Sequence, residues 1–149
     1  MIRTERDPAF WREVASHPLV APHVLLGREF DVGAVAQHAS VTPLAAQHGG
    51  FLFCKLDGLG FVYELHSLFT PEGWGREVHG AGKEALQHIF AQGASVIVTT
   101  QTEDGKAPPR SFGWREADNY RDTDIGNARC WFLTADAWRL SPGGRKCPH

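Results

Sequence analysis

The stretch that decides the fold is residues 62–100, VYELHSLFTPEGWGREVHGAGKEALQHIFAQGASVIVTT. Its first part is apolar and alternating, which predicts a strand over residues 61–69 that Pro71 and Gly73 bring to an end. Its last part, residues 94–100, is a short β-branched run and predicts a buried strand.

Between these two strands lies the clearest helical pattern of the sequence, from about Gly75 to Ala91, with Gly93 after its end. Apolar or small side chains recur there at helical spacing: Val78, Ala81, Gly82, Ala85, Leu86, Ile89 and Phe90. We therefore predict that the helix is a crossover between two parallel strands of one sheet.

Outward from this unit, turn signals at residues 48–50 and 57–58 predict an antiparallel meander. The other predicted elements are strands over residues 42–46, 51–56, 114–120 and 128–134, and helices over residues 8–17 and 31–38. We predict an α/β fold class, in the form of an α+β arrangement in which helices flank one mixed sheet of parallel and antiparallel strands. The 149 residues predict a single domain over residues 1–140 and a flexible, exposed tail over residues 141–149.

The composition argues against several classes of function. The net charge is −2 and basic residues form no run, so nucleic acid is not an expected partner. The apolar stretches are too short to span a membrane, and the charged N-terminus lacks a secretory pattern, which favours the cytoplasm. The 8 histidines and 3 cysteines show no metal-binding spacing, so no metal is expected.

The loop between the first strand and the helix, residues 70–78, has the chemistry of a phosphate site. Gly73 and Gly75 allow the backbone to approach a ligand, and the first helical turn leaves several amides unpaired. Those amides, the positive end of the helix dipole and Arg76 favour an anion. An ordinary turn before a helix has the same features, so the loop alone does not decide between the two.

The order of the predicted elements favours a phosphate site over an ordinary turn. A meander that ends in YELHSLFTP, a glycine-containing turn, a long amphipathic helix and a parallel strand resemble the GNAT superfamily of acyl-CoA N-acyltransferases. The resemblance is to a small phage- and prophage-type branch in particular, and it covers residues 10–133. The tracts that carry it are GGFLF, VYELHSLFTPEGWGRE, GAGKEALQHIF and FGWRE. It implies a GNAT-like fold and acetyl-coenzyme A as co-substrate.

The resemblance also implies how acetyl-coenzyme A binds. In a gap between the two parallel strands, the pantetheine arm would pair with backbone groups of Leu68, Phe69 and Thr70. The diphosphate would lie on the N–H groups of Gly73, Trp74, Gly75, Arg76, Glu77 and Val78. The family has Gln or Arg where this chain has Glu72, and Gly or Ala where it has Glu77, so an acid stands at each end of this phosphate loop.

Acetyl transfer to an amine needs a base for the amine proton and donors for the oxyanion. Glu64 and His66 are two residues apart on one strand and therefore share a face. We expect Glu64 to accept the proton, directly or through water, and His66 to relay it; the alternative is that both only form a polar patch on the sheet. The resemblance makes the amide of Phe69 the oxyanion donor.

The departing thiolate also needs an acid, and here the sequence departs from the family. The family's Tyr and Asn have no counterpart in residues 101–114, QTEDGKAPPRSFGW. Ser111 is the candidate substitute and Tyr120 a more remote one; the alternative is that solvent protonates the thiolate. The favoured function is transfer of an acetyl group to a primary amine of a small molecule or peptide. The alternative is a GNAT-fold binding or interaction protein that has lost catalysis, such as a phage accessory protein. The acceptor and the oligomeric state, including a homodimer, stay open.

Overall fold

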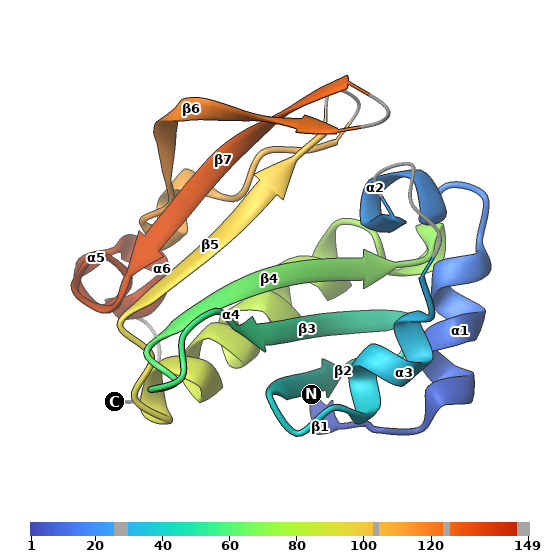
Figure 1. The fold of residues 1–149 in the computed structure, drawn as a ribbon. Helices are drawn as coiled ribbons and strands as arrows, with labels where there is room; N and C mark the ends of the chain where they lie inside the picture. Colours follow the sequence, from blue (N-terminus) through green and yellow to red (C-terminus); the bar gives the residue numbers. More distant parts are fainter. Residues whose placement is uncertain (26–29, 103–104, 124–125, 146–149) are drawn as a thin grey trace.

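A computed structural model describes residues 1–25, 30–102, 105–123 and 126–145, and a single seven-stranded sheet runs through it (Figure 1). The strand order is β1-β2-β3-β4-β5-β7-β6, and β4 and β5 are its parallel pair, all other neighbours being antiparallel. The strands are β1 (Arg3–Thr4), β2 (Val41–Ala45), β3 (Gly49–Lys55), β4 (Val62–Phe69), β5 (Val96–Gln101), β6 (Arg115–Thr123) and β7 (Gly126–Thr134).

Helices cover both faces of this sheet (Figure 1). On one face lies α4 (Arg76–Ala91), whose buried side chains share a core with Phe53 and Leu65. On the other face, Leu52 and Leu68 share a second core with the first helices of the chain. Those helices are α1 (Pro8–Ser16), α2 (Ala21–Leu25) and α3 (Val32–Gln37). The remaining elements are the short helices η1 (Pro71–Gly73), η2 (Arg110–Phe112), α5 (Ala135–Leu140) and α6 (Pro142–Arg145).

The structure confirms the predicted fold class and its central unit. β4, α4 and β5 lie within a few residues of their predicted bounds, and β4 and β5 are parallel, as a crossover helix requires. Both predicted N-terminal helices are also present, each capped by an aspartate side chain: Asp7 for α1 and Asp31 for α3. The sequence did not predict β1, α2, α5 or α6.

The segment that follows residue 140 differs from the frayed, exposed tail that the sequence predicts. Ser141 is buried, and its hydroxyl accepts a hydrogen bond from the amide of Gly144 at 2.9 Å. Gly144 is buried as well, and a Cβ there would clash with the Trp138 carbonyl, so glycine is what allows this close approach. Residues 141–145 thus pack on the domain, and the rest of the predicted tail lies outside the described residues.

The feature that positions the site is the short contact between β4 and β5. Only three residue pairs join them, from Val62–Val96 to Glu64–Val98. Beyond Glu64, β4 stays paired with β3 up to Phe69, and β5 stays paired with β7 up to Gln101. The two strands therefore diverge (Figure 1), and Thr99 Oγ1 donates to the carbonyl of Leu65 at 2.8 Å where they part.

Candidate functional site

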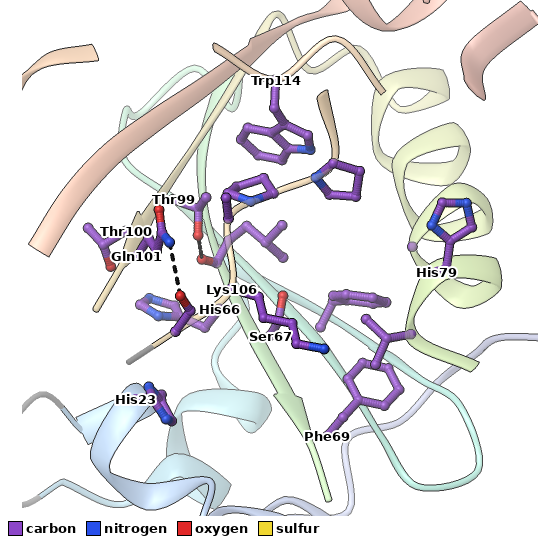
Figure 2. A pocket seen from close by; sticks show the side chains of 18 of the residues that line it. His23, His66, Ser67, Phe69, His79, Thr99, Thr100, Gln101, Lys106 and Trp114 are labelled. Atoms are coloured by element: carbon purple, nitrogen blue, oxygen red, sulfur yellow. Dashed lines mark hydrogen bonds between the residues drawn. The ribbon is translucent and has the colours of Figure 1, made fainter. Parts of the chain in front are cut away.

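A cavity of about 470 Å³ lies where β4 and β5 diverge. Its floor is the carboxyl-terminal part of β4, and its sides are the first half of α4, the end of β5, α2 and residues 105–109. Figure 2 shows the side chains of these elements around one space, among them His66, Ser67 and Phe69. The fold thus places a cavity at the gap in which the pantetheine arm was predicted to bind.

Two hydrogen bonds fix the walls of this cavity beside β5. Gln101 Nε2 donates to the carbonyl of Gly105 at 2.9 Å, which holds residues 105–109 against the end of the strand (Figure 2). His23 Nδ1 lies 2.6 Å from Thr102 Oγ1, which ties α2 to the same strand end. α2 therefore forms part of the site, although no pattern in the sequence predicted this helix.

The helix that opens beside the cavity, α4, starts with unoccupied amides. Gly75 is its N-cap with a φ of +88°, and it has no side-chain capping bond. The first helical hydrogen bond runs from the amide of His79 to the carbonyl of Gly75 at 3.0 Å. Among the described residues, the amides of Arg76, Glu77 and Val78 have no hydrogen-bond partner. They form the open, positive end of a 16-residue helix.

The first part of the predicted phosphate loop is arranged differently. The amide of Gly73 donates to Thr70 at 2.9 Å and that of Trp74 to Pro71 at 3.2 Å, so both are already used within η1. The geometry therefore favours a diphosphate on residues 75–78 rather than on all six predicted amides. The pKa of Glu72, at the start of the loop, is lowered chiefly by a hydrogen bond with the side chain of Thr70.

Backbone groups of β4 face alternately toward β3 and toward the gap. The amide of Thr70 donates to the carbonyl of His48 on the β3 side at 2.9 Å, so Leu68 and Thr70 direct their amides toward β3. The amides of Ser67 and Phe69 consequently face the gap. Phe69 thus suits its predicted role as oxyanion donor, while Ser67 rather than Leu68 or Thr70 joins it along the gap.

Glu64 and His66 come together as predicted, with Glu64 Oε1 3.0 Å from His66 Nε2. Their arrangement differs from the predicted order, because His66 lines the cavity and Glu64 does not. A neutral His66 that donates from Nε2 to the carboxylate has Nδ1 left to accept a proton. The geometry therefore favours His66 as the base and Glu64 as the carboxylate that orients it, which reverses the predicted roles.

The predicted acid, Ser111, lies in η2 with its side chain exposed, and it is not among the residues that line the cavity. Its geometry gives no support to a role at the thioester. Lys106, an exposed residue, lines the cavity instead, and Figure 2 shows its side chain among those around this space. The only sequence signal for Lys106 was its place in the segment where the family has its Tyr. Tyr120 lies in β6, in the part of that strand whose side chains are not described.

Two further classes of site find no support in the described parts of the chain. No group of three His, Cys, Asp or Glu side chains there is placed to hold a metal ion. No helix among the described residues is long and apolar enough to cross a membrane.

No protein-family model and no curated protein matches this chain. Solved structures, in contrast, match nearly the whole chain. A GNAT-family acetyltransferase from Bacillus anthracis is 18% identical over 91% of this chain and 94% of its own, with a TM-score of 0.67. RimJ from Mycobacterium smegmatis, in complex with CoA-disulfide, is 19% identical over 97% of this chain and 86% of its own, with a TM-score of 0.67.

Spermidine N-acetyltransferase from Vibrio cholerae, in complex with CoA and spermine, is 11% identical over 93% of this chain and 96% of its own, with a TM-score of 0.69. Identities this low show a shared fold. The chain therefore has the fold of GNAT acetyltransferases, as the order of its elements predicted.

Proposed function

We propose that this protein transfers an acetyl group from acetyl-coenzyme A to a primary amine. The observation that carries the proposal is the divergence of β4 and β5 around a cavity, with the open N-terminus of α4 beside it. The proposal places the pantetheine arm along the inner edge of β4 and the diphosphate on the amides of residues 75–78. Two of the solved structures of the same fold contain coenzyme A or its disulfide, which supports this choice of donor.

The chain's own groups provide each step of the reaction except the final protonation of the thiolate, which comes from solvent. A neutral amine attacks the acetyl carbon, and the amide of Phe69 donates to the oxygen on which negative charge develops. His66 Nδ1 takes the proton from the attacking nitrogen, and Glu64 stabilises the imidazolium that forms. The carbon–sulfur bond then breaks, and the Lys106 ammonium pairs with the departing thiolate until solvent protonates it.

The lining of the cavity bears on the acceptor. The described residues that line it include Lys106 and three histidines but no Asp or Glu. A polycation such as the spermine bound in the Vibrio cholerae structure would find no carboxylate among them. An acceptor screen should therefore compare monoamines, amino acids and peptides with polyamines.

Thiol release with this panel of amines tests the reaction, and His66→Gln tests its base. Loss of a positioned general base lowers kcat by roughly 10²–10⁴-fold, while coenzyme A binding should stay unchanged. His88→Gln is the matched control, because His88 lies at the far end of α4 and contacts Gln92. Equal turnover in the two variants would remove His66 from the mechanism.

A second function, coenzyme A binding without catalysis, is favoured by one observation. Ser111, the only acid that the sequence offered close to the family's Tyr, lies outside the cavity lining. Coenzyme A binding in calorimetry, together with no thiol release across the acceptor panel, would identify the protein as a binding module. A flat calorimetric titration would reject both functions.

A further inference from the structure

The second residue of α4, Glu77, has its carboxylate bound by His48, a residue from another element of the fold. Glu77 Oε1 lies 3.0 Å from His48 Nδ1, and Glu77 Oε2 accepts a hydrogen bond from the amide of His48 at 3.1 Å. His48 lies on the turn between β2 and β3, and the two side chains are 35% and 24% exposed for His48 and Glu77 respectively. Both carboxylate oxygens are thus engaged by one residue from another part of the chain.

The contact with His48 is important because Glu77 lies in the first turn of α4, beside the amides proposed to bind the diphosphate. A carboxylate in the first turn of a helix is attracted to the helix's own amides and to the positive end of its dipole. In that position it would compete with a diphosphate for the amides of residues 75–78 and would repel the phosphate charges at short range. A phosphate loop can therefore contain a carboxylate at this position only if another group binds it and keeps it from the helix amides.

The neighbouring residues Gly73 and Thr70 accommodate and support the contact between His48 and Glu77. A Cβ on Gly73 would clash with Glu77 Oε2 and lie 3.1 Å from the Cβ of His48, so glycine at this position makes room for the pair. The carbonyl of His48 also accepts hydrogen bonds from the amide of Thr70 at 2.9 Å and from its hydroxyl at 3.3 Å. His48 therefore binds both Thr70, at the start of the phosphate loop, and Glu77, near its end.

We propose that His48 is a positioning residue for coenzyme A: it binds the Glu77 carboxylate and so keeps the amides that open α4 free for the diphosphate. The inference rests on the proposed function, since it assumes coenzyme A as the ligand. It also assigns Gly73 a role that differs from the predicted one, because this glycine accommodates the pair of side chains rather than the ligand.

The experiment compares coenzyme A with pantetheine, which has the same thiol arm but lacks the diphosphate together with the phosphorylated adenosine. In His48→Leu the new side chain fills the space but cannot donate, and only the backbone amide still binds Glu77 Oε2. Coenzyme A affinity should then fall about tenfold while pantetheine affinity changes less than twofold. The loss should shrink as salt is added, because salt screens the released carboxylate. Isothermal titration calorimetry measures both affinities.

Further variants separate the charge effect from general damage. His48→Asn retains a donor near the position of Nδ1 and should keep coenzyme A affinity within about twofold of wild type. In the double variant His48→Leu, Glu77→Gln, the carboxylate is gone and coenzyme A affinity should recover to that of Glu77→Gln alone. His88→Leu, on the same helix but away from the loop, controls for the loss of a partly exposed histidine.

The outcomes are distinct. Equal losses for coenzyme A and pantetheine, or no recovery in the double variant, would mean that His48 only supports the loop, and the inference would be overturned. Unchanged coenzyme A affinity in His48→Leu would overturn it as well. If wild-type protein bound no coenzyme A at any salt concentration, the proposed function would fail first and this inference with it.

Discussion

Gly75 is the residue on which the start of α4 depends. Its φ of +88° lies in the left-handed region, yet a Cβ there would meet no atom within 4 Å. Gly75→Ala should therefore destabilise the protein through backbone strain alone, by about 1 kcal/mol or about 2–4 °C in Tm. Gly80→Ala, on the same helix with equal space and no positive φ, should instead raise Tm slightly. Thermal unfolding of both variants checks this, and a fall in both would contradict it.

At the same scale, Cys54 should be an inert thiol. Its pKa is raised to about 11, first by burial and then by the nearby Glu64 carboxylate. At pH 8 the thiolate fraction should be roughly 100-fold below that of an ordinary cysteine. Iodoacetamide should therefore modify Cys54 slowly, with a rate that keeps rising up to about pH 11. Peptide mapping by mass spectrometry, with glutathione as the reference thiol, measures the rate.

At the scale of the elements, α1 and α3 are joined by one ion pair. Arg12 donates from Nε to Asp31 Oδ1 at 2.9 Å and from Nη2 to Oδ2 at 2.7 Å, and Asp31 also caps α3. The hydrogen bond with Arg12 is the main cause that lowers the pKa of Asp31 from 3.8 to about 2. The unfolded chain binds this proton more tightly, so the pair stabilises the fold above pH 3.8 and its contribution is lost as the pH falls toward 2.

Asp31→Asn should therefore lower Tm by a few degrees at neutral pH, and the deficit should close as wild-type protein loses its advantage below pH 3.8. The effect is modest because both side chains are about half exposed. Thermal melts from neutral to acidic pH measure it, with Asp136→Asn in the exposed pair with Arg139 as the control. A deficit that stayed constant at low pH would show that the loss does not come from the charge of Asp31, because Asn caps a helix about as well as Asp.

The elements that could be predicted are those whose own residues specify them. α4 has an unbroken apolar face and flanking glycines, so its place as a crossover followed from spacing alone. α2 is only 5 residues long and is held beside the end of β5 by the hydrogen bond between His23 and Thr102. Because these residues are far apart in the sequence, no local pattern predicts the contact. Likewise, alternation along β4 put Glu64 and His66 on one face but did not reveal that His66 is the one that reaches the cavity.

At the scale of the whole molecule, the sheet has two halves, β1–β4 and β5–β7, with three paired positions between them. An aromatic cluster helps to join these halves. Trp138 of α5 packs on Phe90 of α4 at 6.5 Å and on Phe112 of η2 at 5.5 Å between ring centroids. Trp138 is 2% exposed and belongs to the same core as Phe53 and Leu65. Trp138 therefore joins α5, α4 and η2 in one core, and Phe112 of this cluster also lines the cavity.

Trp138→Ala should lower the stability by about 3–5 kcal/mol, or roughly 10 °C in Tm, and should weaken coenzyme A binding as well. Trp138→Phe should cost far less, because among the described residues Trp138 Nε1 is buried without a hydrogen-bond partner. Calorimetric unfolding with and without coenzyme A tests both variants. Similar losses in the two would mean that the indole nitrogen has a partner that matters for the fold.

The short pairing of β4 with β5 has one more consequence. A sheet normally has two edges, but this one has four along part of its length, because β4 and β5 are not paired with each other beyond Glu64 and Val98. On the β4 edge, the Trp74 indole already donates to the carbonyl of Phe69 at 2.8 Å. An unpaired edge is also where a foreign strand can add and start aggregation. A ligand with amides of its own, such as pantetheine, would complete the hydrogen-bond ladder from within. The co-substrate would then act as a solubility factor, and protein kept without it should aggregate sooner at high concentration.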